Sequence, residues 1–508
     1  MKKNLHSLLK EVGLTTFNES FDPLITGISC DSRHIEKGDL FIGIRGVIHD
    51  GGRFWSQALS AGASAAVISS AAAKNNPPPP SEPVIILPEI QCGFPGEIAS
   101  AFWEYPSRKM SLIGVTGTNG KTTTTYLIEH LAKSFGKSTA LFGTLVNRWP
   151  GNTTTSIHTT NFADELQAQL AKAIAAGAEI TAMEVSSHSL SQSRVAGCDF
   201  SGAVFTNLTQ DHLDYHHSMN DYFEAKALLF SERYLNSSSA NVVVNVDDLW
   251  GKHLSERLGN KCWRSSLSQD LFESGDAELT ITQLEIDEEG AKGLIHTPVG
   301  VGGFSTRLIG NFNLMNLLQS VGVLVQVGLP FQELLKGIPA FEGVPGRMER
   351  VPYPSEKKYS NFPTVIVDYA HTPDGLKNAL NAARSFVKGE LICVFGCGGD
   401  RDRGKRSQMG SIAFDLSDQI VVTSDNPRNE EPERILNDIL NGIPNLDQVR
   451  VETDRSKAIR MAILDSSKGD LVLVAGKGHE DYQIIGDEKK HFDDTKEVQK
   501  AFLLKSNR

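Results

Sequence analysis

The stretch Gly114-Val115-Thr116-Gly117-Thr118-Asn119-Gly120-Lys121-Thr122-Thr123 has the residue order of a phosphate-binding turn between a strand and a helix. It follows an apolar run over 110–115 and precedes a helical pattern over 126–135. Glycines in such a turn let backbone N–H groups close around phosphate oxygens, and the helix N-terminus and the lysine favour the negative charge. The spacing is shorter than in the standard phosphate loop, because Val115 stands where the first glycine would fall. The stretch predicts a nucleoside triphosphate site between a strand and a helix.

The length and composition limit the class of protein. A chain of 508 residues is too long for one core, and the usual domain size of roughly 100–200 residues predicts about three domains. With 50 Lys+Arg against 61 Asp+Glu, the net charge of −11 gives no electrostatic footprint for nucleic acid or an anionic membrane. The six scattered cysteines indicate neither a disulfide framework nor a zinc motif. No signal core and no apolar run of about 18 residues occurs, so we expect a cytoplasmic protein without membrane insertion.

Strand and helix patterns divide the chain into three expected domains, 1–108, 109–343 and 344–508. Strands are expected at 39–44, 65–70 and 84–87 in the first, and at 141–145, 180–185, 202–206 and 242–246 in the second. Helices are expected at 54–61, 162–176, 219–235, 313–327 and 331–338, and the polar run 266–303 indicates antiparallel additions or long loops. The fold class is therefore α/β, with a small N-terminal α/β domain and a central phosphate-loop ATPase built on a mostly parallel sheet.

Four strands are expected in the last domain, at 364–367, 391–395, 419–423 and 471–475. Each runs directly into polar or glycine-rich sequence. In an open parallel sheet the ligand crevice lies at the carboxyl ends of the strands, so these four loops are expected to line one site.

Three features of the central domain point to metal and phosphate chemistry. Glu184 ends a strand of the same sheet as the phosphate loop, where a carboxylate can bind the Mg²⁺ of a nucleotide. The run 211–217, with His212, offers either metal ligands, for zinc for example, or solvated loop residues. Lys226 falls on the apolar face of a helix. Either its amine escapes to water, or it is buried with a lowered pKa that permits reaction with CO₂ to give a carbamate.

Two loops of the last domain carry dense charge. The basic turn 401–406 follows a strand and a glycine run, which favours anion binding over a solvated face. Asp425-Asn426-Pro427-Arg428 offers opposite charges in a fixed turn, and these suit either an internal salt bridge or the ammonium and carboxylate of one zwitterion.

Together these motifs resemble those of the Mur ligases of peptidoglycan precursor synthesis, over nearly the whole chain. The resemblance rests on 117–123, 183–188, 206–216, 308–316, Gly346-Arg347-Met348-Glu349 and Asp368-Tyr369-Ala370-His371. Further motifs, Asp31-Ser32-Arg33, 425–428 and 476–483, are similar to those of members that use meso-diaminopimelate.

The resemblance implies a three-domain enzyme with a Rossmann-like C-terminal domain, using ATP and Mg²⁺, that joins meso-diaminopimelate to UDP-MurNAc-L-Ala-D-Glu as a monomer. The implied ATP contacts are Gly117, Thr118, Asn119, Gly120, Lys121, Thr122, Thr123, Asn316, Arg347 and Asp368, and the implied metal ligands are Thr122, Glu184, His212 and Lys226 as a carbamate. The implied UDP-substrate contacts are Ser32, Thr159, Thr160, Ser186, Gln192 and Arg194, and the implied amino-acid contacts are Arg401, Asp425, Asn426, Pro427, Arg428, Gly476 and Glu480. Lys121, Lys226 and His212 are the implied catalytic residues.

The expected chemistry is phosphoryl transfer from ATP to the D-glutamyl carboxylate, followed by attack of an amino group on the acyl phosphate. The alternatives are a lysine-adding member of the same family, a folylpolyglutamate synthase, and a nucleotide-dependent switch. A switch gives no role to Lys226 or to the four loops of the last domain.

Overall fold

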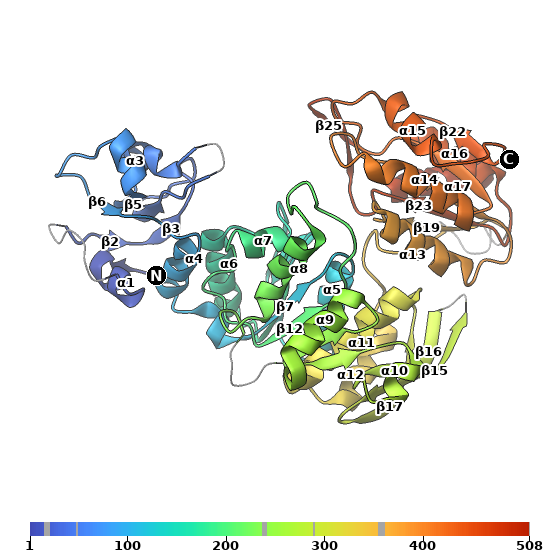
Figure 1. The fold of residues 1–508 in the computed structure, drawn as a ribbon, viewed down its shortest axis with the longest axis horizontal. Coiled ribbons are helices and arrows are strands. Elements are labelled where there is room, and N and C mark those ends of the chain that lie inside the picture. The colour runs from blue at the N-terminus through green and yellow to red at the C-terminus, as the bar shows by residue number, and fades with distance from the viewer. Residues whose placement is uncertain (15–20, 47–48, 236–240, 288–289, 354–360, 507–508) are drawn as a thin grey trace.

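The computed structural model describes residues 1–14, 21–46, 49–235, 241–287, 290–353 and 361–506. Figure 1 shows three α/β bodies in a row, with the N-terminal body (blue) at one end and the C-terminal body (orange to red) at the other. Each body contains its own sheet, and the sheets of the first, second and third have 4, 8 and 6 strands. The predicted α/β class with three bodies is confirmed, whereas the exact boundaries at 108 and 343 stay predictions.

The N-terminal body is a parallel sheet of order β3-β4-β5-β6 with helices packed against it. Its strands are β3 Gly27–Ser29, β4 Asp39–Ile42, β5 Ala65–Ser69 and β6 Val84–Leu87, and β1 Lys3–Asn4 pairs separately with β2 Leu24–Ile25. Its helices are α1 Leu5–Glu11, α2 Trp55–Ala61, α3 Ser70–Asn75 and α4 Phe94–Phe102, with short 3₁₀ turns at Gly51–Phe54 and Pro106–Lys109. The three predicted strands are present, and the short β3 beside them was not predicted.

The central body is built on a sheet of order β10-β9-β8-β11-β7-β12-β13-β14, parallel except where β9 pairs with its two neighbours. Its strands are β7 Ser111–Thr116, β8 Thr139–Phe142, β9 Val146–Trp149, β10 Asn152–Thr155, β11 Ile180–Glu184, β12 Gly202–Phe205, β13 Asn241–Asn245 and β14 Trp263–Ser265. Its helices are α5 Lys121–Ser134, α6 Ala163–Ala175, α7 Ser187–Ser191, α8 Met219–Ala227, α9 Leu249–Leu258, α10 Gln269–Glu273, α11 Asn311–Gln326 and α12 Phe331–Gly337. Short 3₁₀ turns lie at Leu228–Phe230, Gly259–Lys261 and Ile338–Ala340.

Parts of the central body differ from the sequence-based expectation. The helix expected over 219–235 ends at Ala227, because Leu229 and Phe230 turn into the core and Ser231 donates its hydroxyl to the Leu228 carbonyl. The hairpin β9–β10 was not predicted. The polar run from 266 contributes an antiparallel sheet, which is the first of the two options its composition left open: β15 Thr280–Asp287, β16 Gly290–Thr297 and β17 Gly300–Thr306.

The C-terminal body has a sheet of order β18-β19-β23-β20-β21-β22, in which only β18 is antiparallel. Its strands are β18 Glu349–Arg350, β19 Thr364–Asp368, β20 Leu391–Phe395, β21 Gln419–Val422, β22 Val449–Val451 and β23 Leu471–Ala475, with a separate hairpin of β24 Tyr482–Ile485 and β25 Glu488–His491. Its helices are α13 Pro373–Arg384, α14 Gly404–Leu416, α15 Pro432–Leu440, α16 Arg455–Asp465 and α17 Asp494–Ser506. The four predicted strands are neighbours and parallel, so their carboxyl ends share one edge.

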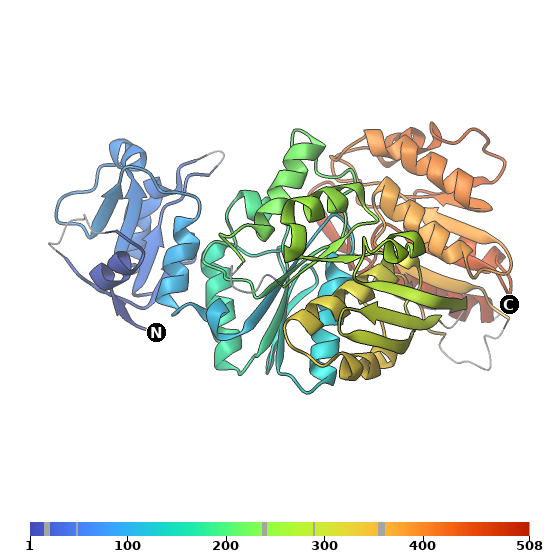
Figure 2. The same ribbon diagram turned by 60° about the horizontal axis from the view of Figure 1, so that its bottom comes forward.

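Polar contacts link neighbouring bodies, and one of these contacts is made by the phosphate loop. Asn119 donates from Nδ2 to Asp374 Oδ2 of the C-terminal body over 3.1 Å. The N-terminal body is tied at Cys30, whose N–H donates to Asp164 Oδ2 of α6 over 2.8 Å. Figure 2 shows the C-terminal body lying against the central one, with the N-terminal body further away. The phosphate loop therefore faces residues of the C-terminal body.

Candidate active site

The phosphate loop joins β7 to α5 in a conformation that requires glycine. Gly117 has φ 150° and Gly120 has φ 88°, and both values favour glycine. A side chain at Gly117 would collide with the Thr206 hydroxyl, and one at Gly120 would come within 2.5 Å of Asn316 Oδ1. The Lys121 ammonium turns back onto the loop, donating to the carbonyls of Gly117 (3.0 Å) and Thr118 (2.8 Å). Burial lowers the pKa of Lys121.

A buried carboxylate lies beside this loop. Glu184 ends β11, next to β7 in the sheet, and is 1 % exposed. Its Oε2 accepts from the hydroxyls of Thr122 (3.1 Å) and Thr144 (3.0 Å), and its Oε1 accepts from the Thr144 N–H (2.8 Å). Carboxylate and hydroxyl oxygens suit a hard cation such as Mg²⁺. Thr144 was not predicted, although its position after β8, at the carboxyl edge of the sheet, was a usable signal.

Lys226 is buried. Of the two alternatives that the sequence left open, the structure therefore favours burial with a lowered pKa over an amine that reaches water. The side chain is 1 % exposed, and Nζ donates to the Gly117 carbonyl over 2.8 Å. The same Nζ lies 4.6 Å from the ring centroid of Tyr222. Burial lowers the pKa of Lys226 well below its usual range, and the Lys121 charge lowers it further. The structure thus places a weakly basic amine against the phosphate loop.

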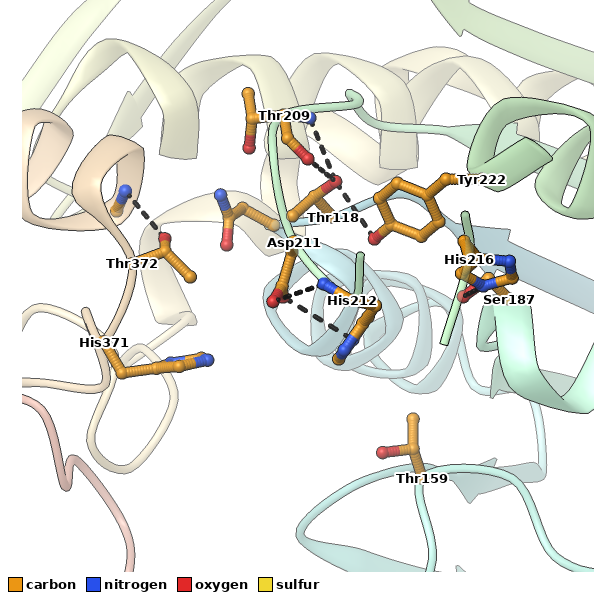
Figure 3. A network of polar contacts seen from close by, with 12 residues as sticks. Thr118, Thr159, Ser187, Thr209, Asp211, His212, His216, Tyr222, His371 and Thr372 are labelled. Carbon is orange, nitrogen blue, oxygen red and sulfur yellow. Dashed lines mark hydrogen bonds and ion pairs between the residues drawn. The ribbon is translucent and has the colours of Figure 1, made fainter. Parts of the chain in front are cut away.

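His212 lies beside Asp211 and near Tyr222, in a network shown in Figure 3. Its Nε2 is 3.5 Å from Asp211 Oδ2, and its backbone has φ 54°. Burial lowers the pKa of His212 to about 4, although Asp211 opposes the shift. In the described part of the chain, no three His, Cys, Asp or Glu side chains are arranged to hold a metal ion. A zinc cluster at 211–217 therefore gains no support.

Figure 3 also shows residues of the C-terminal body facing this loop, with His371 and Thr372 across from Asp211 and His212. The charges of His212 and His371 help to keep the pKa of Asp211 low, against the effect of its burial. On the central side, Thr118 Oγ1 lies 3.2 Å from the Tyr222 hydroxyl. Two bodies thus contribute polar groups to one space beside the phosphate loop.

The three predicted nucleotide contacts from outside the loop occupy different positions. Asn316 lies against Gly120, as described above. Arg347 donates from Nη2 to Thr122 Oγ1 over 3.3 Å, and its guanidinium lies 4.3 Å from the Tyr369 ring centroid. Its Nε is buried and lacks a partner among the described residues, so a donor is left for a ligand. Asp368 accepts from the N–H groups of Met348 and Ala370, and burial raises its pKa.

Most of the residues predicted to contact the UDP-substrate lie in one hydrogen-bonded group that adjoins Glu184. Thr160 donates its hydroxyl to the Glu184 carbonyl (2.9 Å) and accepts from the Ser186 N–H (3.2 Å). Arg194 donates to the Thr160 carbonyl (3.2 Å) and to Gln192 Oε1 (2.8 Å). Thr159 joins the same group through Thr144, whose hydroxyl donates to Thr159 Oγ1 over 3.1 Å. Ser32 lies apart from them, in the N-terminal body after β3.

The turn 425–428 lies at the shared carboxyl edge of the C-terminal sheet. Asp425 does not pair with Arg428 as one alternative supposed, because it faces the Lys477 ammonium over 3.3 Å. Arg428, at φ 51°, donates from Nη1 to the Gly399 carbonyl over 2.8 Å. Glu480 accepts from Asn426 Nδ2 over 2.9 Å. Pro427 lies within the turn, and Gly476, with φ 117°, approaches Asp425 so closely that an added Cβ would be 3.0 Å from Oδ2.

The basic turn is largely engaged within the protein. The anion-binding prediction is wrong for the buried Arg406 and stays a prediction for Arg401, Arg403 and Lys405. Arg406 is fully buried and pairs with Glu430 (2.8 Å) and Asp438 (2.8 Å). Arg403 also pairs with Glu430, and Lys405 donates to the His371 carbonyl. Arg401 donates to the Asp400 carbonyl on the exposed part of the turn. Neither the structural role of Arg406 nor the buried position of Lys477 was predicted.

Comparisons with known proteins match this architecture segment by segment. Residues 24–99 match the family model "Mur ligase family, catalytic domain", 115–324 match "Mur ligase middle domain", and 346–478 match "Mur ligase, glutamate ligase domain". The chain is 58% identical over 501 residues to a UDP-N-acetylmuramoyl-L-alanyl-D-glutamate--2,6-diaminopimelate ligase of Prochlorococcus marinus (strain MIT 9313), covering 99% of each chain. It is 56% identical over 501 residues to a protein of the same name from Synechococcus sp. (strain WH7803), again covering 99% of each. A solved structure with that name has a TM-score of 0.69 at 32% identity and 99% coverage of both chains.

The three α/β bodies and the phosphate loop agree with the three matched domains, which place the chain in the class of ATP-dependent amide-forming ligases. The chain belongs to the Mur ligase family, and the resemblance indicated by its motifs is confirmed. None of the helices in the described part of the chain has the length and apolar character that a membrane span requires.

Proposed function

We propose that this protein is the ATP-dependent ligase that adds meso-diaminopimelate to the D-glutamate of UDP-MurNAc-L-Ala-D-Glu. The observation that carries the proposal is the 58% identity, over 99% of both chains, to a relative with that name. The geometry of the site supports the chemistry in the steps that follow. The enzyme is further proposed to act as a monomer in the cytoplasm.

The phosphate loop and its surroundings suit ATP. The backbone of 117–123 closes on the triphosphate, and Lys121 exchanges its two loop carbonyls for phosphate oxygens. Arg347 supplies its unpaired buried Nε, and Asn316 lines the loop at Gly120. Asp368 accepts from the N–H of Met348, the residue after this arginine, and from the N–H of Ala370 in its own loop.

The oxygen-rich surroundings of Glu184 fit Mg²⁺, and a carbamate on Lys226 would add a negatively charged oxygen ligand where the free lysine offers a cation or an amine. Glu184 and Thr122 would hold the ion, together with His212 and the carbamate form of Lys226. The carbamate forms when the neutral amine attacks CO₂ and loses one proton, which the low pKa favours. Bound Mg²⁺ offsets negative charge on the phosphates.

The reaction joins the two substrates through an acyl phosphate. A carboxylate oxygen of the D-glutamate attacks the γ-phosphorus of ATP, ADP leaves, and the carboxylate becomes a good electrophile. An amino group of diaminopimelate then attacks the carbonyl carbon, loses a proton and expels phosphate. Thr159, Thr160, Ser186, Gln192 and Arg194 hold the UDP-substrate beside Glu184, and Ser32 contacts it from the N-terminal body. Catalysis is therefore mostly positioning and charge stabilisation.

The C-terminal loops hold the incoming amino acid. Arg428 and Arg401 bind a carboxylate, whereas Asp425 and Glu480 attract an ammonium, with Asn426, Pro427 and Gly476 shaping the turn between them. Lysine lacks the distal carboxylate of diaminopimelate and would leave the Arg428 fork unpaired. Diaminopimelate is therefore favoured over the lysine-adding alternative.

The Arg428→Ala variant tests this assignment. Loss of charge-assisted hydrogen bonds worth about 1.5–3 kcal/mol should lower kcat/KM for diaminopimelate by about 10- to 100-fold. KM values for ATP and the UDP-substrate should stay within about twofold, because Arg428 lies at the C-terminal sheet edge. Arg434→Ala, on the exposed face of α15, is the matched control. Unchanged diaminopimelate kinetics in Arg428→Ala would refute the role of this arginine.

A further inference from the structure

Lys477 is a fully buried cation at the centre of the proposed amino-acid site. It follows β23, and its side chain is 0 % exposed. Its Nζ donates to Asn426 Oδ1 (3.0 Å), Glu480 Oε2 (3.2 Å) and Asp425 Oδ1 (3.3 Å). A lysine ammonium has three donors, and here each has an acceptor. Each acceptor belongs to a residue proposed above to bind the incoming amino acid.

These contacts fix the orientation of the Asn426 amide. Its Oδ1 accepts from both Lys477 Nζ and the Ile484 N–H, each over 3.0 Å. Because the oxygen is held by two donors, the NH₂ group must point the other way, and it donates to Glu480 Oε2 over 2.9 Å. Without the Lys477 ammonium, one of the two contacts that select this orientation is lost. Lys477 thus contributes one of the hydrogen bonds that select the orientation of the Asn426 amide in the site.

Lys477 also sets the charge of the site. Asp425 and Glu480 are two carboxylates that share one buried ammonium, so the three groups together carry one net negative charge. One ammonium from a substrate would neutralise that charge. Two uncompensated carboxylates in the same buried place would be costly and would repel each other.

We propose that Lys477 is a positioning residue for the acceptor amino acid: it orients the Asn426 amide and leaves a single net negative charge to receive the acceptor's ammonium. This inference rests on the proposed function. Lys477 acts through Asp425, Asn426 and Glu480, and it requires no contact with the reacting atoms.

A double-mutant cycle on the full-length enzyme tests the proposal with Lys477→Met, Glu480→Gln and the double variant. Lys477→Met should raise KM for diaminopimelate at least about tenfold, while KM for ATP and the UDP-substrate changes less than about twofold. The double variant removes one charge of each sign, so its KM should be at least about fivefold below the product of the two single effects. Lys489→Met is the matched control, because Lys489 lies 3.7 Å from the ring centroid of Tyr482, which Lys477 also approaches, and is exposed.

Different results of this experiment would refute the proposed function and the proposed role of Lys477. A wild-type enzyme that forms no product from diaminopimelate would overturn the proposed function, and this inference with it. Two results would overturn the inference while leaving the proposed function intact, provided that the wild type is active. One is an unchanged KM for diaminopimelate in Lys477→Met. The other is a double variant whose KM equals the product of the two single effects. Loss of cooperative thermal unfolding in both Lys477 variants would assign Lys477 to fold stability, and this result would also overturn it.

Discussion

Lys226 places an amine where water does not reach, between the phosphate loop and the Tyr222 ring. An ammonium in such a place is costly, and the shift of its pKa shows that the neutral form is favoured. A neutral amine is a nucleophile toward CO₂, whereas an ammonium is not. The burial of this one side chain therefore links the fold to the proposed carbamate.

We predict that the enzyme incubated with ¹³C-labelled bicarbonate at pH 8 shows a carbamate carbon resonance, because burial lowers the pKa of the Lys226 amine well below its usual range and so favours its nucleophilic neutral form. The Lys226→Met variant should lack the resonance, and Lys133→Met, on exposed sequence at the end of α5, should retain it. NMR of the purified proteins makes the comparison directly. A resonance that survives in Lys226→Met would exclude this lysine as the modified residue.

The sequence predicted the burial of some cations in the site and not of others. Lys226 was found because a cation on an apolar helix face conflicts with the helical pattern. Lys477 lies in a glycine-rich loop and Arg406 in the basic first turn of α14, where no hydrophobic periodicity distinguishes a buried cation from an exposed one. Their burial depends on carboxylates that are distant in sequence, such as Asp425, 52 residues from Lys477. Such partners become visible only when the chain has folded.

At the scale of elements, a buried ion pair fastens two helices beneath the proposed amino-acid site. Arg455, in the first turn of α16, donates from Nε and Nη2 to both carboxylate oxygens of Asp494 at the start of α17, each over 2.7 Å. Both side chains are 0 % exposed. The same guanidinium donates to the Ala475 and Ser424 carbonyls, at the ends of two sheet strands. It thus joins two helices to the edge that carries the site.

We predict that Arg455→Met lowers the free energy of unfolding of the C-terminal body by about 3–5 kcal/mol, because it leaves the Asp494 carboxylate buried and unpaired. Lys457→Met is the matched control, since the pair of Lys457 with Asp454 on the same helix is exposed and worth about 0–1 kcal/mol. Urea unfolding followed by circular dichroism measures both. Equal stability of the two variants would contradict the role given to the buried pair.

The elements were predictable where their hydrophobic pattern was strong. All four apolar strands of the C-terminal sheet were found, because each is a short buried run ending in polar sequence. The hairpin β24–β25 was missed, since its charged residues at 488–490 give little β signal. Yet it reaches the site, where Ile485 of β24 forms a bridge with Arg428. Tertiary contacts, rather than local propensity, hold this hairpin.

At the scale of the whole molecule, the site is assembled between bodies. Arg347 of the C-terminal side donates to Thr122 of the phosphate loop, and Asn119 of that loop donates to Asp374. The division into three bodies followed from the alternation of strands and helices and from length. The family resemblance also implied that Arg347 and Asp368 meet the phosphate loop. The contact of Asn119 with Asp374 was not predicted, because no local pattern encodes contacts between residues more than 200 positions apart.

We propose that one enzyme molecule couples ATP cleavage to the joining of UDP-MurNAc-L-Ala-D-Glu with meso-diaminopimelate. The most direct measurement is ADP formation by the purified protein with each substrate omitted in turn and with diaminopimelate, lysine or ornithine as the amino acid. We predict that sustained ADP release requires the UDP-substrate and diaminopimelate together, with lysine and ornithine supporting at least about tenfold less, because they leave Arg428 unpaired. ADP release that is indifferent to both substrates would contradict the claim and favour a nucleotide-dependent switch, and a preference for lysine would contradict the assignment of the amino acid.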